Sequence, residues 1–315
     1  MNENSWICII TVAIIGGLTF LVLRFWRSTK TALARVGIGF ISLIDVSILL
    51  LLGLFLNGLY LLNTPVNTSE TPMAHIGSDS VQVARGEKLA NLCAGCHSST
   101  GKLPLDGGSI NYLGGGIMGS IYAPNLTSAG STKDWSDVQW IRAIREGVDD
   151  QGLPLLIMPS DAYRYLSDAD VQGIVAYLRA QTPVDRVIHD RELSPLTILL
   201  IGAKLFPTST QVPSSGGVTA PSQGPTAEYG KYLVTIMACA SCHGSNLDGR
   251  TSGYAPTGPN LLKLVRNMDQ ATFVKILRIR GVNPNGEMPF FNISAAASDD
   301  DLIAIYNYLH SLAIP

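Results

Sequence analysis

The sequence has little charge of either sign. Only 15% of its 315 residues are Asp, Glu, Lys or Arg, and the formal net charge is −2. It therefore lacks the basic excess that is typical of nucleic-acid-binding proteins, and we expect no nucleic-acid partner. Aromatic residues are also few, at 7% in a chain that is 46% hydrophobic. A chain of this length has room for two or three domains.

Cysteine is scarce as well, with five residues, and four of the five fall into two short motifs. These are Cys93-Ala94-Gly95-Cys96-His97 and Cys239-Ala240-Ser241-Cys242-His243. Disulfides are therefore not the framework of this fold. The remaining cysteine, Cys8, lies in an apolar run and is expected to be an inert buried or lipid-facing thiol.

Two cysteines three positions apart, followed at once by a histidine, are the attachment pattern of haem c. The two thiols reach the vinyl groups on one edge of a porphyrin, and the histidine binds the iron. Half of a zinc site is the alternative, but zinc needs a second pair of ligands about 15–20 residues away, and neither motif has one. The sequence therefore predicts two covalently bound haem c groups, with thioether residues Cys93, Cys96, Cys239 and Cys242 and iron ligands His97 and His243.

Charged residues are absent from Trp6 to Leu23, and a second apolar stretch, Val36–Leu62, is interrupted only by Asp45. Each stretch is long enough to cross a bilayer as a helix. A cleaved signal peptide is the alternative, but it has positive charge before its apolar run and a small-residue cleavage site after it. Here the basic residues follow the first run. The sequence predicts a two-helix transmembrane anchor over residues 1–62.

The short connection between the two spans carries Arg24, Arg27, Lys30 and Arg35. The positive-inside rule keeps this loop in the cytoplasm, so both ends of the hairpin face outward. Haem c is assembled outside the cytoplasmic membrane, and the motifs therefore require the same orientation. We expect haem domains on the periplasmic side. Asp45 is either a functional residue within the membrane or a side chain that snorkels or pairs with Arg35.

The same landmarks recur in the same order in two segments, which indicates an internal duplication. A helix leads into each motif, over Val81–Cys93 and Glu228–Ala238. Next come Pro-Asn-Leu, a helix, Met-Pro, and Ser-Asp-x-Asp as the N-cap of a last helix. The later landmarks are Pro124-Asn125-Leu126, Trp135–Glu146, Met158-Pro159 and Ser167 in the first copy, and Pro259-Asn260-Leu261, Phe273–Arg280, Met288-Pro289 and Ser298 in the second.

The predicted fold is all-α. The N-terminal anchor (1–62) is followed by a linker (63–80), a first small helical domain (81–182), a second linker (183–225) and a second small domain (226–315). The second linker contains Pro195–Phe206, which is apolar except for Lys204 but too short to span a bilayer. It is either an interfacial helix or a strap between the domains.

The second axial ligand of each iron is expected to be a methionine. Besides the motif histidines the chain has only His75, His189 and His310, and the last two have no counterpart in the other copy. Met158 and Met288 occur at matching places, each before a proline. A thioether opposite imidazole raises the reduction potential and closes the iron to small ligands, which suits electron transfer. Packing in the core is the alternative for either methionine.

Further residues are expected around each haem. A backbone carbonyl just after each motif, at Pro124 and Pro259, is placed to accept the second ring N–H of the ligating histidine and fix its orientation. The haem propionates have several candidate partners, among which the sequence does not choose: Trp135, Trp140, Arg142 and Tyr163.

The order of these landmarks resembles class I cytochrome c, twice over, across residues 81–182 and 226–314. The stretches Ala123-Pro124-Asn125-Leu126-Thr127 and Pro183-Val184-Asp185-Arg186 are similar to membrane-anchored dihaem cytochromes c of bacteria, including the cytochrome subunits of periplasmic dehydrogenases. The resemblance implies small all-α domains around covalent haem with His/Met ligation. The expected hairpin departs from the single anchor helix of these proteins.

The leading functional hypothesis is a non-catalytic electron carrier or relay on the outer face of the cytoplasmic membrane. Its expected partners are a donor dehydrogenase or quinol-oxidising complex and an acceptor cytochrome or oxidase. One alternative is a dihaem enzyme, of the peroxidase or thiosulfate-oxidising type, which needs an open or unusually ligated iron. Another is a subunit that mainly anchors a larger complex, through small residues such as Gly16-Gly17 and Gly37 in its membrane helices.

Overall fold

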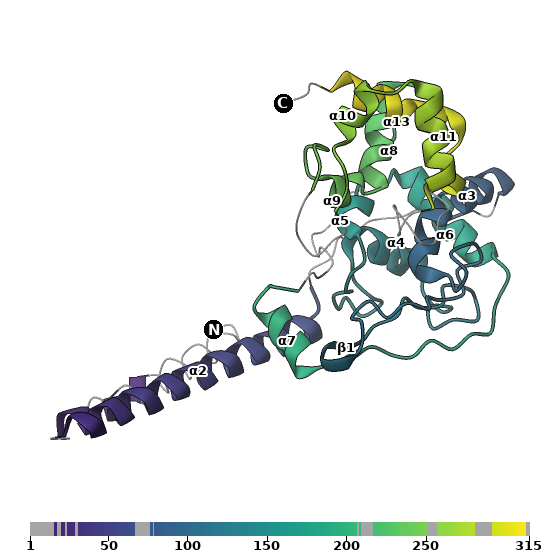
Figure 1. The fold of residues 1–315 in the computed structure, drawn as a ribbon. Coiled ribbons are helices and arrows are strands. Elements are labelled where there is room, and N and C mark those ends of the chain that lie inside the picture. The colour runs from purple at the N-terminus through teal and green to yellow at the C-terminus, as the bar shows by residue number, and fades with distance from the viewer. Residues whose placement is uncertain are drawn as a thin grey trace. The chain divides into compact units, whose positions relative to one another are not determined.

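The chain forms two units, Met1–Leu61 with Pro195–Phe206, and Leu62–Ser194 with Pro207–Pro315. Both consist mainly of helices (Figure 1). The computed structural model describes residues 16–17, 20–22, 24–28, 31–66, 76–77, 79–206, 208, 217–250, 257–280 and 292–312.

The first unit is built on one long helix, α2 (Ala32–Asn63). Among the described residues it alone is long and apolar enough to cross a membrane, and the most apolar stretch of it is not buried within the structure. Asp45 lies on this helix and is exposed. The second predicted span, Val36–Leu62, is therefore confirmed as a helix. The first, Trp6–Leu23, lies mostly outside the described residues, so the two-helix anchor stays a prediction.

The apolar segment 195–206 begins as a short helix, α7 (Pro195–Gly202), that packs against α2. Asn57 Nδ2 donates a hydrogen bond to Gly202 O at 2.7 Å. A Cβ at Gly58 would lie only 2.0 Å from Ile198 O, so the two backbones approach this closely because position 58 is glycine. The segment is therefore a helix seated on α2, and its position in a membrane interface stays a prediction.

In the second unit, the first copy is organised by the crossing of α3 (Ser80–His97) and α6 (Asp168–Ala180). The helices touch at Gly86 and Gly173, where a Cβ on Gly86 would lie 1.7 Å from Gly173 O. Leu89 of α3 and Ile174 of α6 are buried beside this crossing. The remaining helices of the first copy are η1 (Gly116–Met118), α4 (Asp137–Glu146) and α5 (Ser160–Tyr163).

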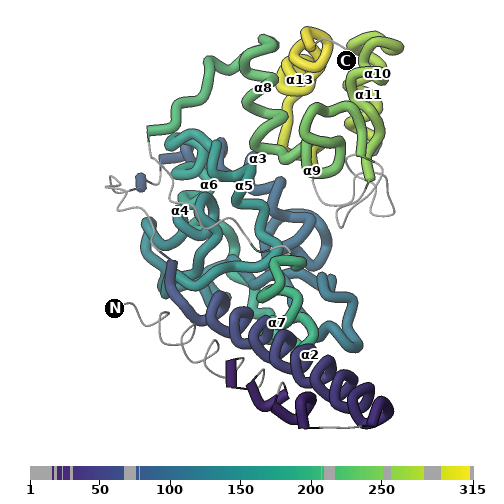
Figure 2. The backbone as a smooth tube through the Cα atoms, turned by 90° about the vertical axis from the view of Figure 1, so that its left-hand side faces the viewer, coloured from purple at the N-terminus to yellow at the C-terminus, as the bar shows by residue number. Residues whose placement is uncertain are grey.

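The second copy repeats this arrangement. Helix α8 (Ala227–Ile236) crosses α13 (Asp299–Ser311), and a Cβ on Gly230 would lie 1.9 Å from Ala304 O. Figure 2 shows α8 and α13 next to each other, with the remaining helices of this copy close by. Those helices are α9 (Cys239–His243), α10 (Leu261–Arg266), α11 (Gln270–Arg280) and α12 (Ile293–Ala296).

The last helix of each copy begins as the sequence predicts. Ser167 Oγ accepts a hydrogen bond from Asp170 N at 3.1 Å, and Ser298 Oγ accepts one from Asp301 N at 3.2 Å. Each serine satisfies a backbone N–H that has no partner within its own helix. The acidic residues of the first turn also complement the positive end of the helix dipole.

The helices that lead into the motifs differ from each other. In the first copy α3 continues through the motif to His97, beyond the predicted end at Cys93. In the second copy α8 ends at Ile236, two residues short of the predicted end, because Ala238 adopts a left-handed conformation with φ of 53°. The second motif therefore forms a separate short helix, α9.

Residues 183–194, which were expected to be part of the linker, lie against the first copy. Asn125 Nδ2 donates to Val184 O at 2.9 Å, and Arg186 Nη2 donates to Ser109 Oγ at 3.0 Å. Strand β1 (Gly119–Ser120) pairs antiparallel with β2 (Glu192–Leu193). The all-α prediction did not include this pair of two-residue strands, because strands this short show no alternation of hydrophobic and polar residues in the sequence.

Candidate functional site

The first motif occupies the C-terminal turn of α3, which sets the positions of its side chains. Cys93 and Cys96 are three residues apart on a helix, so both thiols lie on one face. Neither is in a disulfide, and both are half-buried. His97 follows at the helix end, with Nδ1 3.0 Å from Pro124 O. This is the contact that the sequence predicts for a ligating histidine.

The second motif has the same surroundings on a different local backbone. Cys239 and Cys242 lie on α9, are half-buried and form no disulfide. His243 Nδ1 lies 2.8 Å from Pro259 O. Two copies with different backbones thus place the imidazole against the carbonyl of the equivalent proline.

In each copy, the loop that follows the motif folds back over the histidine, and two glycines of that loop make this possible. Gly107 N donates to His97 O at 2.8 Å, and Gly249 N donates to His243 O at 2.8 Å. One further glycine in each copy approaches the motif backbone: a Cβ on Gly108 would lie 2.3 Å from Cys96 O, and one on Gly258 would lie 2.8 Å from Cys242 O. Glycine is the residue that permits these approaches, and the loop therefore brings the proline carbonyl to the imidazole.

Burial keeps the thiols of Cys93 and Cys239 and the ring of His97 neutral. Removal from water, with a smaller contribution from the neighbouring Cys96, raises the pKa of the Cys93 thiol to about 12. Burial likewise raises the pKa of Cys239 to about 12. Burial lowers the pKa of His97 and outweighs the opposing hydrogen bond to Pro124, so the ring is neutral near pH 7.

These residues fit a covalently held haem. Each motif offers two thiols on one helix face that are not consumed by a disulfide. When the neutral His97 donates its Nδ1 proton to Pro124 O, the lone pair of Nε2 is available to iron. Nδ1 of His243 likewise faces the carbonyl oxygen of Pro259. The role of each residue as a haem ligand stays a prediction.

The two candidate methionines differ in what the structure describes. Met158 lies in the loop before α5, is half-buried and packs against the hydrophobic core. Its neighbour Ile157 has a φ of 68°, which β-branched residues rarely adopt, so the backbone at this point is strained. Met288 lies outside the described residues. The axial-ligand role of Met158 stays a prediction, with core packing as its alternative.

The candidate propionate partners lie in two places. Trp135 and Trp140 contact each other edge to face, with ring centroids 5.2 Å apart, and Arg142 lies 4.0 Å from Glu146 on α4. Tyr163, on α5, is buried, and its burial, followed by the nearby thiols of Cys93 and Cys96, raises its pKa. Tyr163 is therefore the candidate whose proximity to the first motif the structure documents.

A pair of equivalent arginines was not predicted from the sequence. Arg145, at the end of α4, donates to Leu166 O and, at 2.7 Å, to Asp168 Oδ1. Arg278, on α11, donates to Ala297 O at 2.8 Å and to Asp299 Oδ1 at 2.6 Å. Each arginine ties its helix to the start of the last helix of its copy. The sequence does contain a signal for this pair, since an arginine occurs at the equivalent position of the matching helix in both copies.

Comparison with known proteins agrees with this geometry. The cytochrome c family model matches residues 83–182 and 227–313, together more than half of the chain. The fructose dehydrogenase cytochrome subunit of Gluconobacter japonicus is 27% identical over 197 residues, which cover 59% of this chain and 39% of that protein. A nicotinate dehydrogenase subunit of Pseudomonas putida is 30% identical over 200 residues, which cover 56% of this chain and 15% of that protein.

This chain thus aligns with less than half the length of either relative. The resemblance to the cytochrome subunits of dehydrogenases is confirmed at the level of sequence, since the first relative bears that name and the second is named as a subunit of a dehydrogenase. The family match spans both motif-bearing segments and implies covalently bound haem c. This electron-transfer chain belongs to the cytochrome c family.

Proposed function

We propose that this protein is a membrane-tethered dihaem cytochrome c that relays electrons on the outer face of the cytoplasmic membrane. The observation that carries the proposal is the repeated histidine environment, with Nδ1 of His97 and of His243 each within 3.0 Å of a proline carbonyl. Both motifs have two thiols outside disulfides and a histidine that faces a proline carbonyl, and we therefore propose that both hold a haem. The haem supplies the one-electron iron couple, and the chain supplies attachment, ligands and burial.

The tether is the N-terminal apolar region. Helix α2 is long enough to cross the hydrocarbon core of a bilayer. The first predicted span, residues 6–23, makes the anchor a hairpin whose basic loop lies in the cytoplasm. Both motif-bearing domains then follow on the periplasmic side, where haem c is attached.

The partners follow from the relatives. One relative is named as the cytochrome subunit of fructose dehydrogenase and the other as a subunit of nicotinate dehydrogenase. We propose that this chain accepts electrons from a partner dehydrogenase, or from a quinol-oxidising complex, and delivers them to an acceptor cytochrome or oxidase. In this role the protein itself performs no substrate chemistry.

The mass of the mature protein tests the dihaem assignment. We expect two added haem groups in the wild type and one in each of the variants Cys93→Ala/Cys96→Ala and Cys239→Ala/Cys242→Ala, since each thiol pair holds one porphyrin. A wild-type mass with one added haem, or with none, contradicts the proposal. Fractionation of the same cells, with and without residues 1–62, measures the membrane tether independently.

Replacing Met158 with leucine separates the ligand role from core packing. Leucine fills a similar volume, so packing alone predicts a small loss of stability and an unchanged spectrum. If Met158 binds iron, we expect the first haem to lose its low-spin His/Met spectrum and its potential to fall by more than about 0.1 V, within the roughly 0.8 V range that axial ligands span. Optical spectra and redox titration measure both.

Met118→Leu is the control, because Met118 is half-buried in the same copy but has no counterpart in the other. It is expected to leave spectrum and potential unchanged. The equivalent variant of the second copy is Met288→Leu. A high-spin haem in the unmodified protein, or rapid binding of cyanide or CO, favours the alternative of a dihaem enzyme with an open iron.

A further inference from the structure

The two copies meet through a largely buried group of polar side chains, here called the interdomain cluster: Arg85 and Asp170 of the first copy, and Tyr229 and Tyr232 of the second. Arg85 Nε donates to Asp170 Oδ1 at 2.8 Å, and Arg85 Nη2 donates to the hydroxyl of Tyr229 at 3.1 Å. Asp170 is 4% exposed and Tyr229 is 0% exposed. Charged and polar groups so deeply buried contribute stability only in the arrangement that satisfies them.

Tyr232 makes the closest contacts across the interface. Its hydroxyl donates to Asp170 Oδ2 at 2.5 Å and accepts from Ser167 N at 2.9 Å. The same ring stacks on Tyr229, with centroids 5.9 Å apart. The hydroxyl of Tyr232 therefore makes two hydrogen bonds to the N-terminal turn of α6. Together they restrict sliding or rotation of the second copy against the first.

A separate ion pair and an apolar contact lie beside the cluster. Lys88 Nζ is 2.5 Å from Asp301 Oδ2, and the same carboxylate oxygen accepts from Ser298 N at the start of α13. Helix α12 packs against α3, and one hydrophobic core runs through both copies. These contacts join the two copies directly. The linker between them is rich in Pro, Ser and Gly over residues 208–226, and by itself it would leave their separation variable.

Arg85 and the two tyrosines of the cluster keep their protonation states across the physiological pH range. Burial disfavours the charged form of Arg85, but hydrogen bonds and attraction to Asp170 outweigh it and raise the pKa further above its ordinary value. Burial, followed by the charge of Asp170, raises the pKa of Tyr232. Arg85 therefore stays charged and Tyr232 stays protonated, and each keeps its hydrogen bonds.

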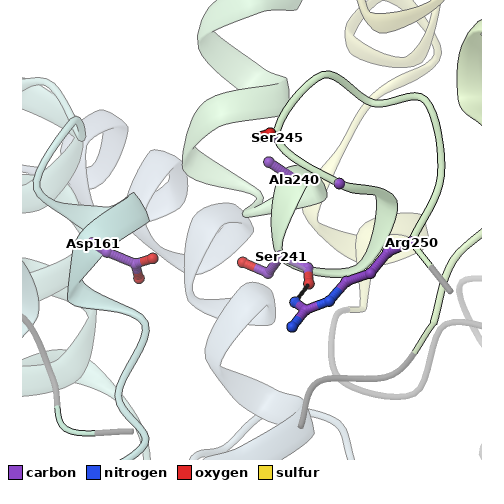
Figure 3. Close-up of a pocket in the computed structure, with 6 residues that line it drawn as sticks. Asp161, Ala240, Ser241, Ser245 and Arg250 are labelled. Carbon is purple, nitrogen blue, oxygen red and sulfur yellow. Dashed lines mark hydrogen bonds between the residues drawn. The ribbon is translucent and has the colours of Figure 1, made fainter. Parts of the chain in front are cut away.

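This interface brings particular parts of the two motif regions together. Helix α5, which begins two residues after Met158, contacts α8. An open cavity of about 430 Å³ is lined by Asp161 of the first copy and by residues of the second, and Figure 3 shows these side chains around it. The residues from the second copy are Ala240, Ser241, Gly244, Ser245 and Arg250. Ala240 and Ser241 separate the two cysteines of the second motif.

We propose that the interdomain cluster positions the two motifs for electron transfer between them, from the Met158 side of the first copy to the cysteine edge of the second or in reverse. The proposal rests on the dihaem function proposed above. Transfer of one electron oxidises one iron and reduces the other, and no proton or covalent bond moves. Arg85, Asp170, Tyr229 and Tyr232 are positioning residues in this step, because they act on the separation of the two sites.

The double variant Tyr229→Phe/Tyr232→Phe tests the proposal in the full-length protein. It removes both hydroxyls that cross the interface and keeps both rings. The matched control is Tyr306→Phe, which removes a hydroxyl that donates to Met268 O at 3.1 Å within the second copy. For each protein, the potentials of both haems, the rate of electron equilibration between them after rapid reduction of one, and the number of thermal unfolding transitions are measured.

We expect the double variant to keep both potentials, to equilibrate electrons about tenfold or more slowly, and to unfold in two transitions where the wild type and the control unfold in one. Three hydrogen bonds to charged or buried groups are lost with the two hydroxyls, and we expect the docked-to-undocked ratio to shift by about ten- to a hundredfold. An unchanged rate with a single transition overturns the proposal. A slower rate with altered potentials also overturns it, because the hydroxyls then act on the haems themselves.

The test remains decisive if the double variant fails to fold or if the wild type carries fewer than two haems. If the double variant does not accumulate, Tyr232→Phe and Lys88→Gln are examined with the same measurements and the same criteria. If the wild type carries fewer than two haems, the dihaem function fails, and the number of unfolding transitions still decides whether the cluster couples the two copies.

Discussion

Replacing Gly86 with alanine is expected to lower the free energy of unfolding of the first copy by about 3 kcal/mol, because overpacking forces backbones apart. A Cβ at this position lies 1.7 Å from Gly173 O, a backbone atom that cannot turn aside. Intrinsic helix propensity has the opposite sign, since alanine is favoured over glycine by about 1 kcal/mol in a helix. Denaturant or thermal unfolding, followed by the haem absorbance, measures the change.

Ala84→Gly is the control for Gly86→Ala. Ala84 is exposed on the same helix, so its replacement tests propensity alone and is expected to cost about 1 kcal/mol. Gly230→Ala, at 1.9 Å from Ala304 O, is expected to destabilise the second copy in the same way. A stabilising effect of Gly86→Ala would show that α3 and α6 do not cross as closely as described.

Replacing Arg145 with methionine is expected to cost about 3 kcal/mol of stability, because it breaks a buried charged contact. Arg145 is 0% exposed and holds both Leu166 O and the carboxylate of Asp168. Its Nε and Nη1 atoms have no hydrogen-bond partner among the described residues, so an apolar side chain recovers part of the burial cost. Equilibrium unfolding of the variant measures the loss.

Arg278→Met is the matched comparison, because Arg278 makes the equivalent contacts in the second copy but its side chain is 31% exposed and that of Asp299 is 71% exposed. We expect a smaller loss, of about 1 kcal/mol, since a solvated ion pair contributes little. Equal losses at both positions would contradict the argument from burial. A spectrum that changes with Arg145→Met would show that the loop bearing Met158 depends on this contact.

Local patterns were sufficient for much of this fold. The spacing within Cys93–His97 and Cys239–His243 depends on neighbouring residues alone, and so does a serine N-cap such as Ser167 or Ser298. The order of the landmarks is a one-dimensional property, and it predicted the duplication that the crossings of α3 with α6 and of α8 with α13 repeat in space. Apolar length alone likewise predicted the helix at Val36–Leu62.

Contacts between residues far apart in the chain were decided only by packing. Arg85 and Tyr229 are 144 positions apart in the chain. No pattern in the sequence near either residue predicts that they contact each other and share a cluster with Asp170. The strand pair β1–β2 arises for the same reason, since it joins residues 119–120 to residues 192–193. Sequence thus determined the two motifs, their helices and the chemistry that they support. How the two copies face each other followed only from three-dimensional burial, because the free energy of a buried polar contact depends on partners that distance along the chain does not reveal.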